Sequence, residues 1–410
     1  MLEQVRDQEI DEGDVSAPAA GPAGVRTGWP RFEPDEIGAA VAVLRSGRVN
    51  YWTGNEGRAF EREFAAACHL QYAVAVANGT VALEAILHAL GIGTGDEVVV
   101  TPRSFIASAS CVAMRGARPV FADVDPVSQN ISAATIAPTL SERTRAIICV
   151  HLAGWPCDMD PILALARARD IEVIEDCAQA QGALYKGRPV GSLGDIAAFS
   201  FCQDKITTTA GEGGMVVTND PDLWQQCWSW KDHGKDWSAT RREHPPGFRW
   251  LHASFGTNGR MTELQAAIGR LQLRKLPAWL AARRRNAALL NELLADVDCL
   301  RVPRPPLEVD HAYYKYYAFL RPDHLRPGWS RDRIVAEVTA KGVPCFSGSC
   351  PEIYDEKAFT RAGLQPPSRL PVARELGATS LMLLVDHTLD EGAIRRTAAA
   401  LRQVLAAATR

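Results

Sequence analysis

The sequence predicts an α/β fold with a large, mostly parallel sheet and a second, smaller α/β domain toward the C-terminus. The chain has 410 residues, which is long enough for two lobes with a sizeable core. Short apolar runs that are typical of buried strands alternate with stretches of helical periodicity, as in YAVAVAN followed by VALEAILHAL. Strands that alternate with helices in this way predict a parallel sheet covered by helices.

The chain is expected to divide into three parts. Residues 1–25 are acidic and then rich in Ala, Pro and Gly, without periodicity, which predicts a mobile tail. Residues 26–275 carry most of the strand-like runs and are expected to form the large domain. Residues 276–410 are expected to form the smaller domain, after a long helical stretch that links the two.

The large part opens with two predicted helices on either side of a glycine-punctuated loop. The first runs from Pro34 to about Ser46, and the second begins at about Arg58. In the first helix the apolar residues share one face. These residues are Ile37, Val41 and Leu44.

The first strand, YAVAVAN, ends at a turn of small residues before the next helix. Gly79 and Thr80 follow the strand directly. The backbone N–H groups at such a helix start form an anion site, so the turn is a candidate phosphate cradle. An ordinary N-cap by Thr80 explains the same residues, and the local sequence leaves both interpretations open.

Two further strands lead to candidate site residues. The run GDEVVVTP precedes the helix SFIASASCVAMRG, with Phe105 in its first turn, where the local sequence favours a core residue. Asp176 follows IEVIE at the carboxyl end of a strand, where open α/β sheets place their ligands. A helix cap is an equally good explanation of that carboxylate. Gln179 lies one helical turn further on, so both side chains can face one site.

The run IAAFSF predicts a buried strand that ends in Ser200 and Phe201, and one lysine, Lys205, follows it. The glycine turn GEGG and the strand-like run MVVT come next. A lysine at the mouth of a strand pair is a candidate for a covalent bond to a carbonyl cofactor, provided its amine is desolvated or close to another cation. Taken alone, the pattern favours an ordinary solvated turn.

The second half of the chain adds a helix, a long loop and the smaller domain. A helix is predicted from Pro221 to Lys231, and residues 233–261, rich in Gly, Pro and aromatics, are expected to form a functional loop or lid. The helical stretch that starts at TELQAAIG carries three consecutive arginines, residues 283–285, which we interpret as a solvated face. The run AYYKYYAFL is a predicted strand, and a closing helix begins at about Asp390.

Composition excludes several classes of function. The net charge of -3 gives no reason to expect nucleic acid or an anionic membrane as a partner. No apolar run is long enough to span a bilayer, and we expect a cytoplasmic protein. The ten cysteines are scattered without a CxxC pair, which suits free thiols, and the nine histidines show no metal-binding spacing. Cys345 and Cys350 are expected to be structural.

A series of motifs in one order resembles a known family. The motifs are TGNEGRAFEREFA, ANGTVALEAIL, GDEVVVTPRSFIASAS, HLAGWPCDMDPI, EDCAQAQGALYKGRPVGSLGD, FSFCQDK with GEGG, and TNGRMTELQAAIGRLQL. The chain resembles the DegT/StrS group of pyridoxal phosphate-dependent aminotransferases, which have the fold-type I architecture. The resemblance extends from Trp29 to the C-terminus, and its motifs are specific for the family and the cofactor but not for the substrate.

The resemblance implies roles for the candidate residues. Lys205 matches the lysine that binds pyridoxal 5'-phosphate covalently, and Asp176 matches the carboxylate paired with the pyridine nitrogen. Gln179 matches a glutamine near the phenolic oxygen, and Phe105 matches the aromatic residue that stacks on the ring. Three positions match the phosphate site, which are Gly79, Thr80 and Ser200.

The resemblance also implies partners. Asn258 resembles an asparagine that reaches the phosphate from the neighbouring subunit, which implies a homodimer with shared active sites. The expected reaction moves an amino group from an amino acid, with glutamate expected as donor, to a nucleotide-linked keto-sugar. Neither the nucleotide nor the aminated carbon follows from the sequence, and Arg242 and Arg249 are only guesses for residues that grip a diphosphate.

Departures from the family pattern and other reactions complete the expectations. Many relatives have histidine in place of Gln181 and an aromatic residue in place of Gly259. Alternatives on the same scaffold are a sugar dehydratase, which Lys205 argues against, an aromatase, and a regulator that binds the cofactor without turnover. No DNA-binding helix pair or basic domain supports the last of these.

Overall fold

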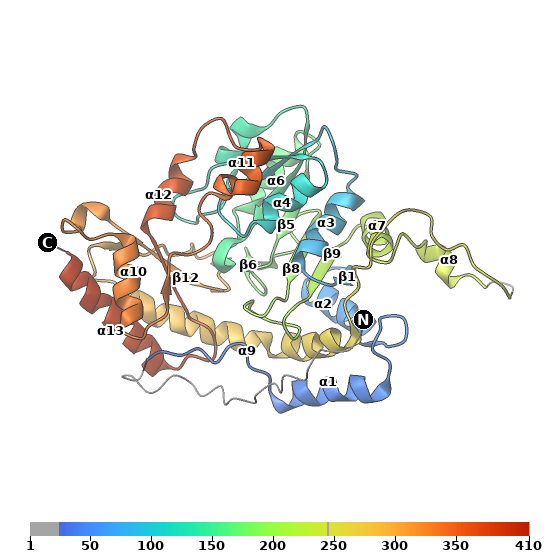
Figure 1. Ribbon diagram of the computed structural model, residues 1–410, viewed down its shortest axis with the longest axis horizontal. Coiled ribbons are helices and arrows are strands. Elements are labelled where there is room, and N and C mark those ends of the chain that lie inside the picture. Colours follow the sequence, from blue (N-terminus) through green and yellow to red (C-terminus); the bar gives the residue numbers. More distant parts are fainter. Residues whose placement is uncertain (1–23, 244–245, 410) are drawn as a thin grey trace, which may run out of the picture.

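The computed structural model describes residues 24–243 and 246–409. These form a large sheet domain and a smaller sheet domain, and the long helix α9 (Glu263–Leu293) runs along both (Figure 1). The predicted boundary between residues 275 and 276 falls inside this helix, and the division into domains stays a prediction. No helix within the described ranges is both long and apolar enough to cross a membrane.

The large domain is built on a seven-stranded sheet. Its strands, in spatial order, are β1 (Tyr72–Val76), β9 (Gly214–Thr218), β8 (Ile196–Ser200), β5 (Glu172–Asp176), β4 (Thr144–Val150), β2 (Glu97–Val100) and β3 (Arg118–Phe121). The strands from β8 to β3 are parallel to one another, while β9 is antiparallel to both β8 and β1. The predicted α/β fold with a mostly parallel sheet is therefore confirmed.

Helices cover both faces of this sheet, as its alternating side chains require. Val99 of β2 points into one apolar core, while Val98 and Val100 point into the other. The first core includes residues of α2 (Glu56–Ala67), α5 (Ala133–Ile136), α6 (Met159–Arg167) and α9. The second includes residues of α3 (Gly79–Ala89), α4 (Ala107–Met114) and α7 (Pro221–Lys231). Single helical turns lie at η1 (Ala137–Thr139) and η2 (Leu152–Gly154).

The smaller domain packs helices on a four-stranded antiparallel sheet. Its strands, in order, are β10 (Leu300–Arg301), β12 (Tyr316–Leu320), β14 (Ser380–Leu383) and β13 (Cys345–Phe346). The helices α10 (Arg331–Ala340) and α13 (Glu391–Ala408) pack on this sheet, and η3 (Pro322–His324) follows β12. The helices η4 (Ile353–Asp355) and α11 (Lys357–Ala362) contribute to the second core of the large domain, and α12 (Pro371–Thr379) contributes to the first. The two domains also meet in a small sheet, in which β11 (Val309–Asp310) pairs with β6 (Leu184–Tyr185) and β6 pairs with β7 (Arg188–Pro189).

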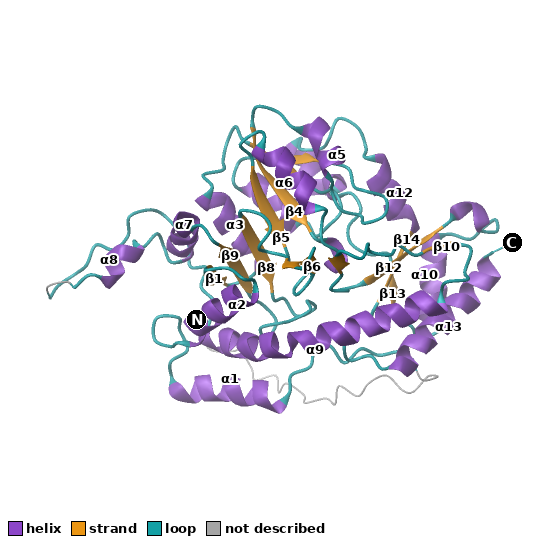
Figure 2. Cartoon of the chain, turned by 180° about the vertical axis from the view of Figure 1, so that it is seen from behind, coloured by secondary structure: helices purple, strands orange, loops and turns teal. Residues whose placement is uncertain are grey.

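The helix α1 (Pro34–Ser46) has the predicted bounds. Ile37, Val41 and Leu44 are exposed, and the face that packs against α9 buries Glu36 and Val43. Apolar spacing located a shared face but not the surface that covers the helix. Figure 2 shows α1 lying outside the body of the chain, beneath α9.

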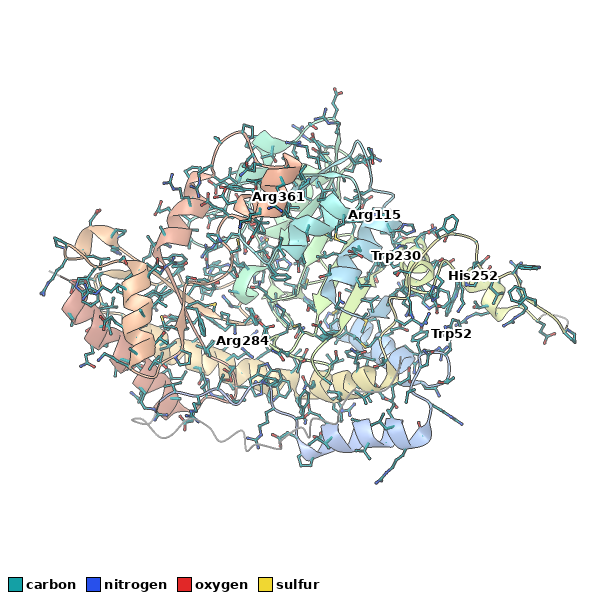
Figure 3. The ribbon with its side chains drawn as sticks, in the orientation of Figure 1. Trp52, Arg115, Trp230, His252, Arg284 and Arg361 are labelled. Atoms are coloured by element: carbon teal, nitrogen blue, oxygen red, sulfur yellow. The ribbon has the colours of Figure 1, made fainter. Side chains whose placement is uncertain are left out.

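The sequence predicts neither a helix nor a strand for two segments, the loop region at residues 233–261 and the N-terminal tail. The helix α8 (Trp237–Arg241) extends away from the large domain together with residues 242–243 and 246–257 (Figures 1 and 2). We call these residues the arm. His252 lies on this arm (Figure 3), and Phe248, Trp250 and Phe255 are exposed on it. Most of the predicted N-terminal tail lies outside the described residues, but Val25 is buried and its N–H donates to the Gly342 carbonyl.

Candidate active site

The carboxyl ends of β1, β5 and β8 border one cavity of about 510 Å³. Seven of the eight residues predicted for the site line it, namely Gly79, Thr80, Phe105, Asp176, Gln179, Ser200 and Lys205. Strands of one sheet thus bring to one edge residues that are up to 126 positions apart in the sequence. Their roles toward a cofactor stay predictions, but the structure brings these side chains together.

The turn after β1 has the form of an anion cradle. The side chain of Asn78, not of Thr80, caps α3 by accepting a hydrogen bond from Val81 N–H at 2.9 Å. The first-turn N–H groups of Gly79 and Thr80 therefore have no partner inside the helix. A Cβ atom on Gly79 would lie 2.7 Å from the Cβ of Ser200, so only glycine allows this strand end and this helix start to approach so closely.

Asp176 is held by hydrogen bonds at the end of β5. It is buried, its Oδ2 accepts a hydrogen bond from Ser108 Oγ at 2.7 Å, and its Oδ1 accepts one from Ala178 N–H at 3.1 Å. The carboxylate is therefore fixed in direction rather than free to rotate. The hydroxyl oxygens of Ser104 and Ser108 lie 3.2 Å apart, and the two serines are one helical turn apart in sequence. This spacing of two serines was the signal for Ser108 that sequence reasoning missed.

Gln179 and Phe105 lie on the walls of the cavity. The side-chain oxygen of Gln179 accepts a hydrogen bond from Ala153 N–H at 2.8 Å, which fixes the amide. Phe105 precedes α4 rather than lying in its first turn, and its ring is 65% exposed. A core role, which the local sequence favours for Phe105, is therefore excluded. An exposed ring at a cavity mouth is available to stack on a planar ligand.

Lys205 lies in the loop after β8, and this loop is fixed at two points. Gln181, where many relatives have histidine, donates from Nε2 to the Ser200 carbonyl at 2.6 Å and accepts from Thr207 N–H at 2.8 Å. Trp29 Nε1 donates to the Lys205 carbonyl oxygen at 2.8 Å. Both interactions hold the backbone on either side of the lysine, and neither had a signal in the local sequence.

A carboxylate and a phenol accompany the Lys205 amine. Asp204 Oδ1 lies 3.8 Å from Lys205 Nζ, and Tyr314 donates its hydroxyl hydrogen to Asp204 Oδ2. Burial raises the pKa of the Asp204 carboxyl, but the charge of Lys205 and the bond from Tyr314 outweigh it, so that the pKa lies below its ordinary value. Asp204 is therefore an ionised carboxylate that lies beside the lysine.

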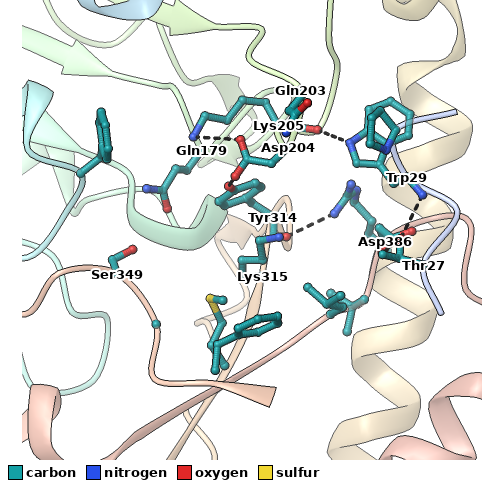
Figure 4. Close-up of a pocket in the computed structure, with 18 of the residues that line it drawn as sticks. Thr27, Trp29, Gln179, Gln203, Asp204, Lys205, Tyr314, Lys315, Ser349 and Asp386 are labelled. Carbon is teal, nitrogen blue, oxygen red and sulfur yellow. Dashed lines mark hydrogen bonds and ion pairs between the residues drawn. The ribbon is translucent and has the colours of Figure 1, made fainter. Parts of the chain in front are cut away.

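A second cavity, of about 480 Å³, continues from the first toward the smaller domain (Figure 4). The two cavities share five lining residues, which are Ser104, Phe105, Gln179, Asp204 and Lys205. The N-terminal segment, α9 and the smaller domain supply most of the rest, including Thr27, Trp29, Arg283, Lys315 and Asp386. The site thus has two halves, one formed by the large domain and one formed by the segments that dock against it.

The interpretation of residues 283–285 as a solvated face was wrong for Arg283. This side chain is 1% exposed and lines the second cavity. Arg284 (Figure 3) is partly buried and its Nε donates to the His311 carbonyl oxygen at 3.1 Å, while Arg285 is exposed as predicted. Arg283 lies on the buried side of α9 because the smaller domain packs there, which the local sequence does not state.

Asn258 is the one predicted site residue that does not line either cavity. It is exposed at the base of the arm, where it pairs with Asp232 in an isolated β-bridge. This placement fits a residue that acts on a neighbouring subunit, and that role stays a prediction. The next residue, Gly259, is buried, and a Cβ atom there would lie 2.9 Å from Val81 Cγ1, so the aromatic residue of many relatives would require a shift.

Several other candidates do not line the first cavity, in which seven predicted site residues meet. His151, Glu175 and Cys177 lie close enough together to hold a metal ion, but Glu175 and His151 bond to each other at 2.9 Å. Cys157 N–H donates to the remaining nitrogen of His151, so these groups are already committed. Cys350 lines the second cavity while Cys345 is buried in the smaller domain. Arg242 and Arg249 lie on the arm, outside both cavities.

The residues present fit pyridoxal phosphate. The cradle at Gly79 approaches Ser200 so closely that no side chain fits, and it offers N–H groups at the positive end of a helix to an anion. A lysine, a fixed carboxylate and an exposed aromatic ring border the same cavity. Lysine, carboxylate and anion cradle are the three groups that this cofactor's aldehyde, ring nitrogen and phosphate require.

Comparison with known proteins decides the family. Residues 30–402 match the DegT/DnrJ/EryC1/StrS aminotransferase family. The chain belongs to this family. It is an aminotransferase that depends on pyridoxal phosphate, so the predictions of family, fold and cofactor are confirmed.

Similar proteins cover nearly the whole chain. An aminotransferase from Psychrobacter cryohalolentis superposes with a TM-score of 0.91 and 54% identity, over 93% of this chain and 98% of that one. GDP-perosamine synthase of Caulobacter vibrioides is 39% identical over 367 residues, which are 86% of this chain and 92% of that protein. UDP-N-acetyl-3-dehydro-alpha-D-glucosamine 3-aminotransferase of Acidithiobacillus ferrooxidans is 38% identical over 371 residues, or 90% and 94%.

Proposed function

We propose that this aminotransferase moves an amino group from an amino-acid donor, glutamate, to a nucleotide-linked keto-sugar and so produces an amino sugar. The observation that carries the proposal is the convergence of Lys205, Asp176 and the cradle at Gly79 in one cavity. The names of the two curated relatives support the substrate class, because one makes a GDP-linked sugar and the other aminates a UDP-linked one.

The large-domain residues divide the work of holding and reacting. The N–H groups of Gly79 and Thr80 and the hydroxyl of Ser200 would bind the phosphate, and Phe105 would stack on the ring. Gln179 would lie near the phenolic oxygen, and Asp176 would hold a proton at the pyridine nitrogen. Pyridoxal phosphate, when bound, supplies an electron sink for the pair left behind when a Cα–H bond breaks.

Lys205 carries out the proton transfer. Its amine would hold the cofactor, and as a free amine it would take the proton from the donor Cα as a general base. In the second half of the reaction the same amine returns a proton to the carbon of the sugar that receives the amino group. Asp204, Trp29 and Gln181 keep the amine within reach by fixing the loop on both sides.

We also infer that the working enzyme is a cytoplasmic homodimer with shared active sites. Asn258 is exposed and lies outside its own cavity, and the same loop exposes three aromatic residues, Phe248, Trp250 and Phe255. Sedimentation of the holoenzyme should give a dimer, and mixing Lys205→Ala with Asn258→Ala protomers should restore part of the activity that each variant lacks. A fully active monomer would contradict the inference.

An absorbance spectrum of the holoenzyme, before and after addition of glutamate, tests the reaction. Glutamate should shift the band near the visible edge to the shorter wavelength of the aminated cofactor, and a nucleotide-linked keto-sugar should then restore it. Glutamine serves as a matched donor with a neutral side chain. A band that responds to no amino acid would refute the proposal, whereas a band restored only by non-sugar keto compounds would refute the substrate class.

A further inference from the structure

Arg283 is a buried cation without an acidic partner. It is 1% exposed, and its Nη1 donates to the carbonyl oxygens of Tyr313 and Tyr314 at 3.2 and 3.3 Å. Its Nε has no hydrogen-bond partner among the described residues. Burial lowers the pKa of the guanidinium to about 10. The charge of Asp386 opposes this shift only in part, because Asp386 forms no ion pair with Arg283.

Lys315 is a second cation, partly buried, and it lines the same cavity. It precedes β12, and its backbone N–H bonds to the Ala153 carbonyl. Its ammonium lies 4.7 Å from the ring centroid of Tyr314 and forms no ion pair within the described ranges. Burial lowers the pKa of Lys315, and the more distant charge of Asp204 offsets this only in part.

The two carboxylates of the cavity are already engaged elsewhere. Asp204 accepts the hydroxyl hydrogen of Tyr314, and Asp386 accepts that of Thr27 at 2.9 Å and the N–H of Thr388 at 3.1 Å. Neither carboxylate forms an ion pair with Arg283 or Lys315 within the described ranges, so an anion that enters the cavity meets two cations that lack an ion-pair partner. Figure 4 shows Lys315, Asp386 and Tyr314 around this part of the cavity.

We propose that Arg283 and Lys315 form a carboxylate-binding subsite for a substrate of the enzyme. A planar carboxylate matches the two N–H directions of a guanidinium and the single charge of an ammonium. Lys205 and Lys315 lie over the same ring of Tyr314, at 5.1 and 4.7 Å from its centroid, so the carboxylate binds within one small molecule's length of the reacting amine.

Two substrates can supply this carboxylate, and the chemistry is the same for both. One source is the amino-acid donor, and the other is an acid group on the sugar ring. The diphosphate of a nucleotide sugar fits less well, because the whole ring separates it from the carbon that reacts. The inference rests on the proposed function for the identity of these substrates, but binding at the subsite is measurable without turnover.

The first experiment measures binding by the holoenzyme through the fluorescence of Trp29, which lines the cavity. The probes are glutarate and glucuronate, with glutaramide and glucose as their neutral counterparts. We expect an acid probe to bind and its neutral counterpart to bind at least about 10-fold more weakly, since a hydrogen bond to a charged group contributes about 1.5–3 kcal/mol. Binding of glutarate identifies the donor as the source, and binding of glucuronate alone identifies the sugar.

Lys315→Met tests the residue, because it keeps most of the side-chain length and removes the charge. It should weaken the acid probe about 10-fold or more and leave the neutral probe and the cofactor spectrum unchanged. Lys315→Arg should restore binding, and Lys341→Met, at an exposed lysine, is the matched control. Arg283 is avoided because it also ties the backbone at Tyr313 and Tyr314.

Kinetics separate this inference from the proposed function. In the variant Lys315→Met the KM for the carboxylate substrate should rise while kcat changes little, because the lost contact is remote from the proton transfer. An effect on glutamate but not on glutamine assigns the side-chain carboxylate, and an equal effect on both assigns the α-carboxylate. If the wild type transaminates but Lys315→Met binds every acid probe as tightly as the wild type, the subsite is refuted and the proposed function stands.

Discussion

The cofactor half and the substrate half of the site differ in how the chain builds them. In the cofactor half, Gly79, Asp176 and Ser200 stand at or just after the carboxyl ends of β1, β5 and β8, and the geometry of this one sheet brings them together. In the substrate half, Trp29 and Arg283 come from the N-terminal segment and from α9 and meet only because the smaller domain docks there. The first half depends on one rigid sheet, and the second depends on the packing of separate segments.

This difference predicts where substitutions act. A change in the cofactor half removes a group from a preorganised site and should reduce catalysis by orders of magnitude. A change in the substrate half should alter binding and orientation by smaller factors, because each contact is one of several. The predictions below run from the first half to the second.

Lys205→Ala should have the largest effect. Without the amine, the cofactor loses its covalent attachment and the proton on Cα has no base within reach, so turnover should fall by about 10,000-fold or more. Single-turnover absorbance with glutamate measures it, and Lys357→Ala, at an exposed lysine, is the control. Retention of wild-type turnover would remove Lys205 from its proposed role.

Asp176→Asn should reduce turnover on the order of 100-fold, because it keeps the shape and the contact with Ser108 but removes the charge. The cofactor should also bind more weakly, which equilibrium dialysis measures. Asp170→Asn changes an exposed aspartate just before the same strand and should leave both quantities unchanged. Equal behaviour of the two variants would mean that Asp176 is only structural.

Gly79→Ala should weaken cofactor binding about 10-fold, since its Cβ would lie 2.7 Å from the Cβ of Ser200 and overpacking costs about 1–3 kcal/mol. Gly38→Ala in α1 is the matched control, because nothing lies within 4 Å of its Cβ and alanine favours a helix. The readouts are the dissociation constant of the cofactor and the thermal midpoint. Unchanged cofactor affinity in Gly79→Ala would place the phosphate cradle elsewhere.

Local signals placed residues of the cofactor half at strand ends, but only the ordered series of family motifs predicted their roles, because each local pattern left an ordinary structural explanation open. Asp176 ends an apolar strand and Lys205 follows another, and the order of the strands decides the rest. The two details that failed were also local: Asn78 caps α3 instead of Thr80, and Phe105 lies before α4 instead of inside it. Both are shifts of one or two residues at a helix end.

The substrate half carried one signal that sequence reasoning passed over. Arg283 lies three residues after Leu280 and four before Ala287, and all three are buried on one side of α9. Helical spacing therefore placed this arginine on an apolar face, although its charge suggested solvent. Trp29 and Lys315 gave no such signal, because only the docking of distant segments brings them to the cavity.

The pH dependence of carboxylate binding would sharpen the contrast. The charged form of Lys315 binds, and burial lowers its pKa below the ordinary lysine value, so affinity for the acid probe should fall as the pH rises toward that pKa. In Lys315→Arg the fall should be reduced to the part that Arg283, with a pKa of about 10, contributes. The charged groups that face Lys315 are Asp204, Arg283, Asp386 and Lys205. Identical profiles for both proteins would exclude titration of Lys315.

Trp29→Phe should have the smallest effect and is the sharpest test of the boundary between the halves. The change removes the indole N–H that donates to the Lys205 carbonyl at 2.8 Å, together with the pyrrole ring that carries it. A neutral hydrogen bond contributes about 1 kcal/mol, so kcat should fall about 5-fold. Trp279→Phe is the matched control, because Trp279 packs edge-on against Trp29, with ring centroids 5.2 Å apart. If both variants lower kcat equally, Trp29 acts through packing alone. If only Trp29→Phe lowers kcat and KM stays unchanged, the N-terminal segment positions the reacting lysine, and the substrate half contributes directly to the chemistry of the cofactor half.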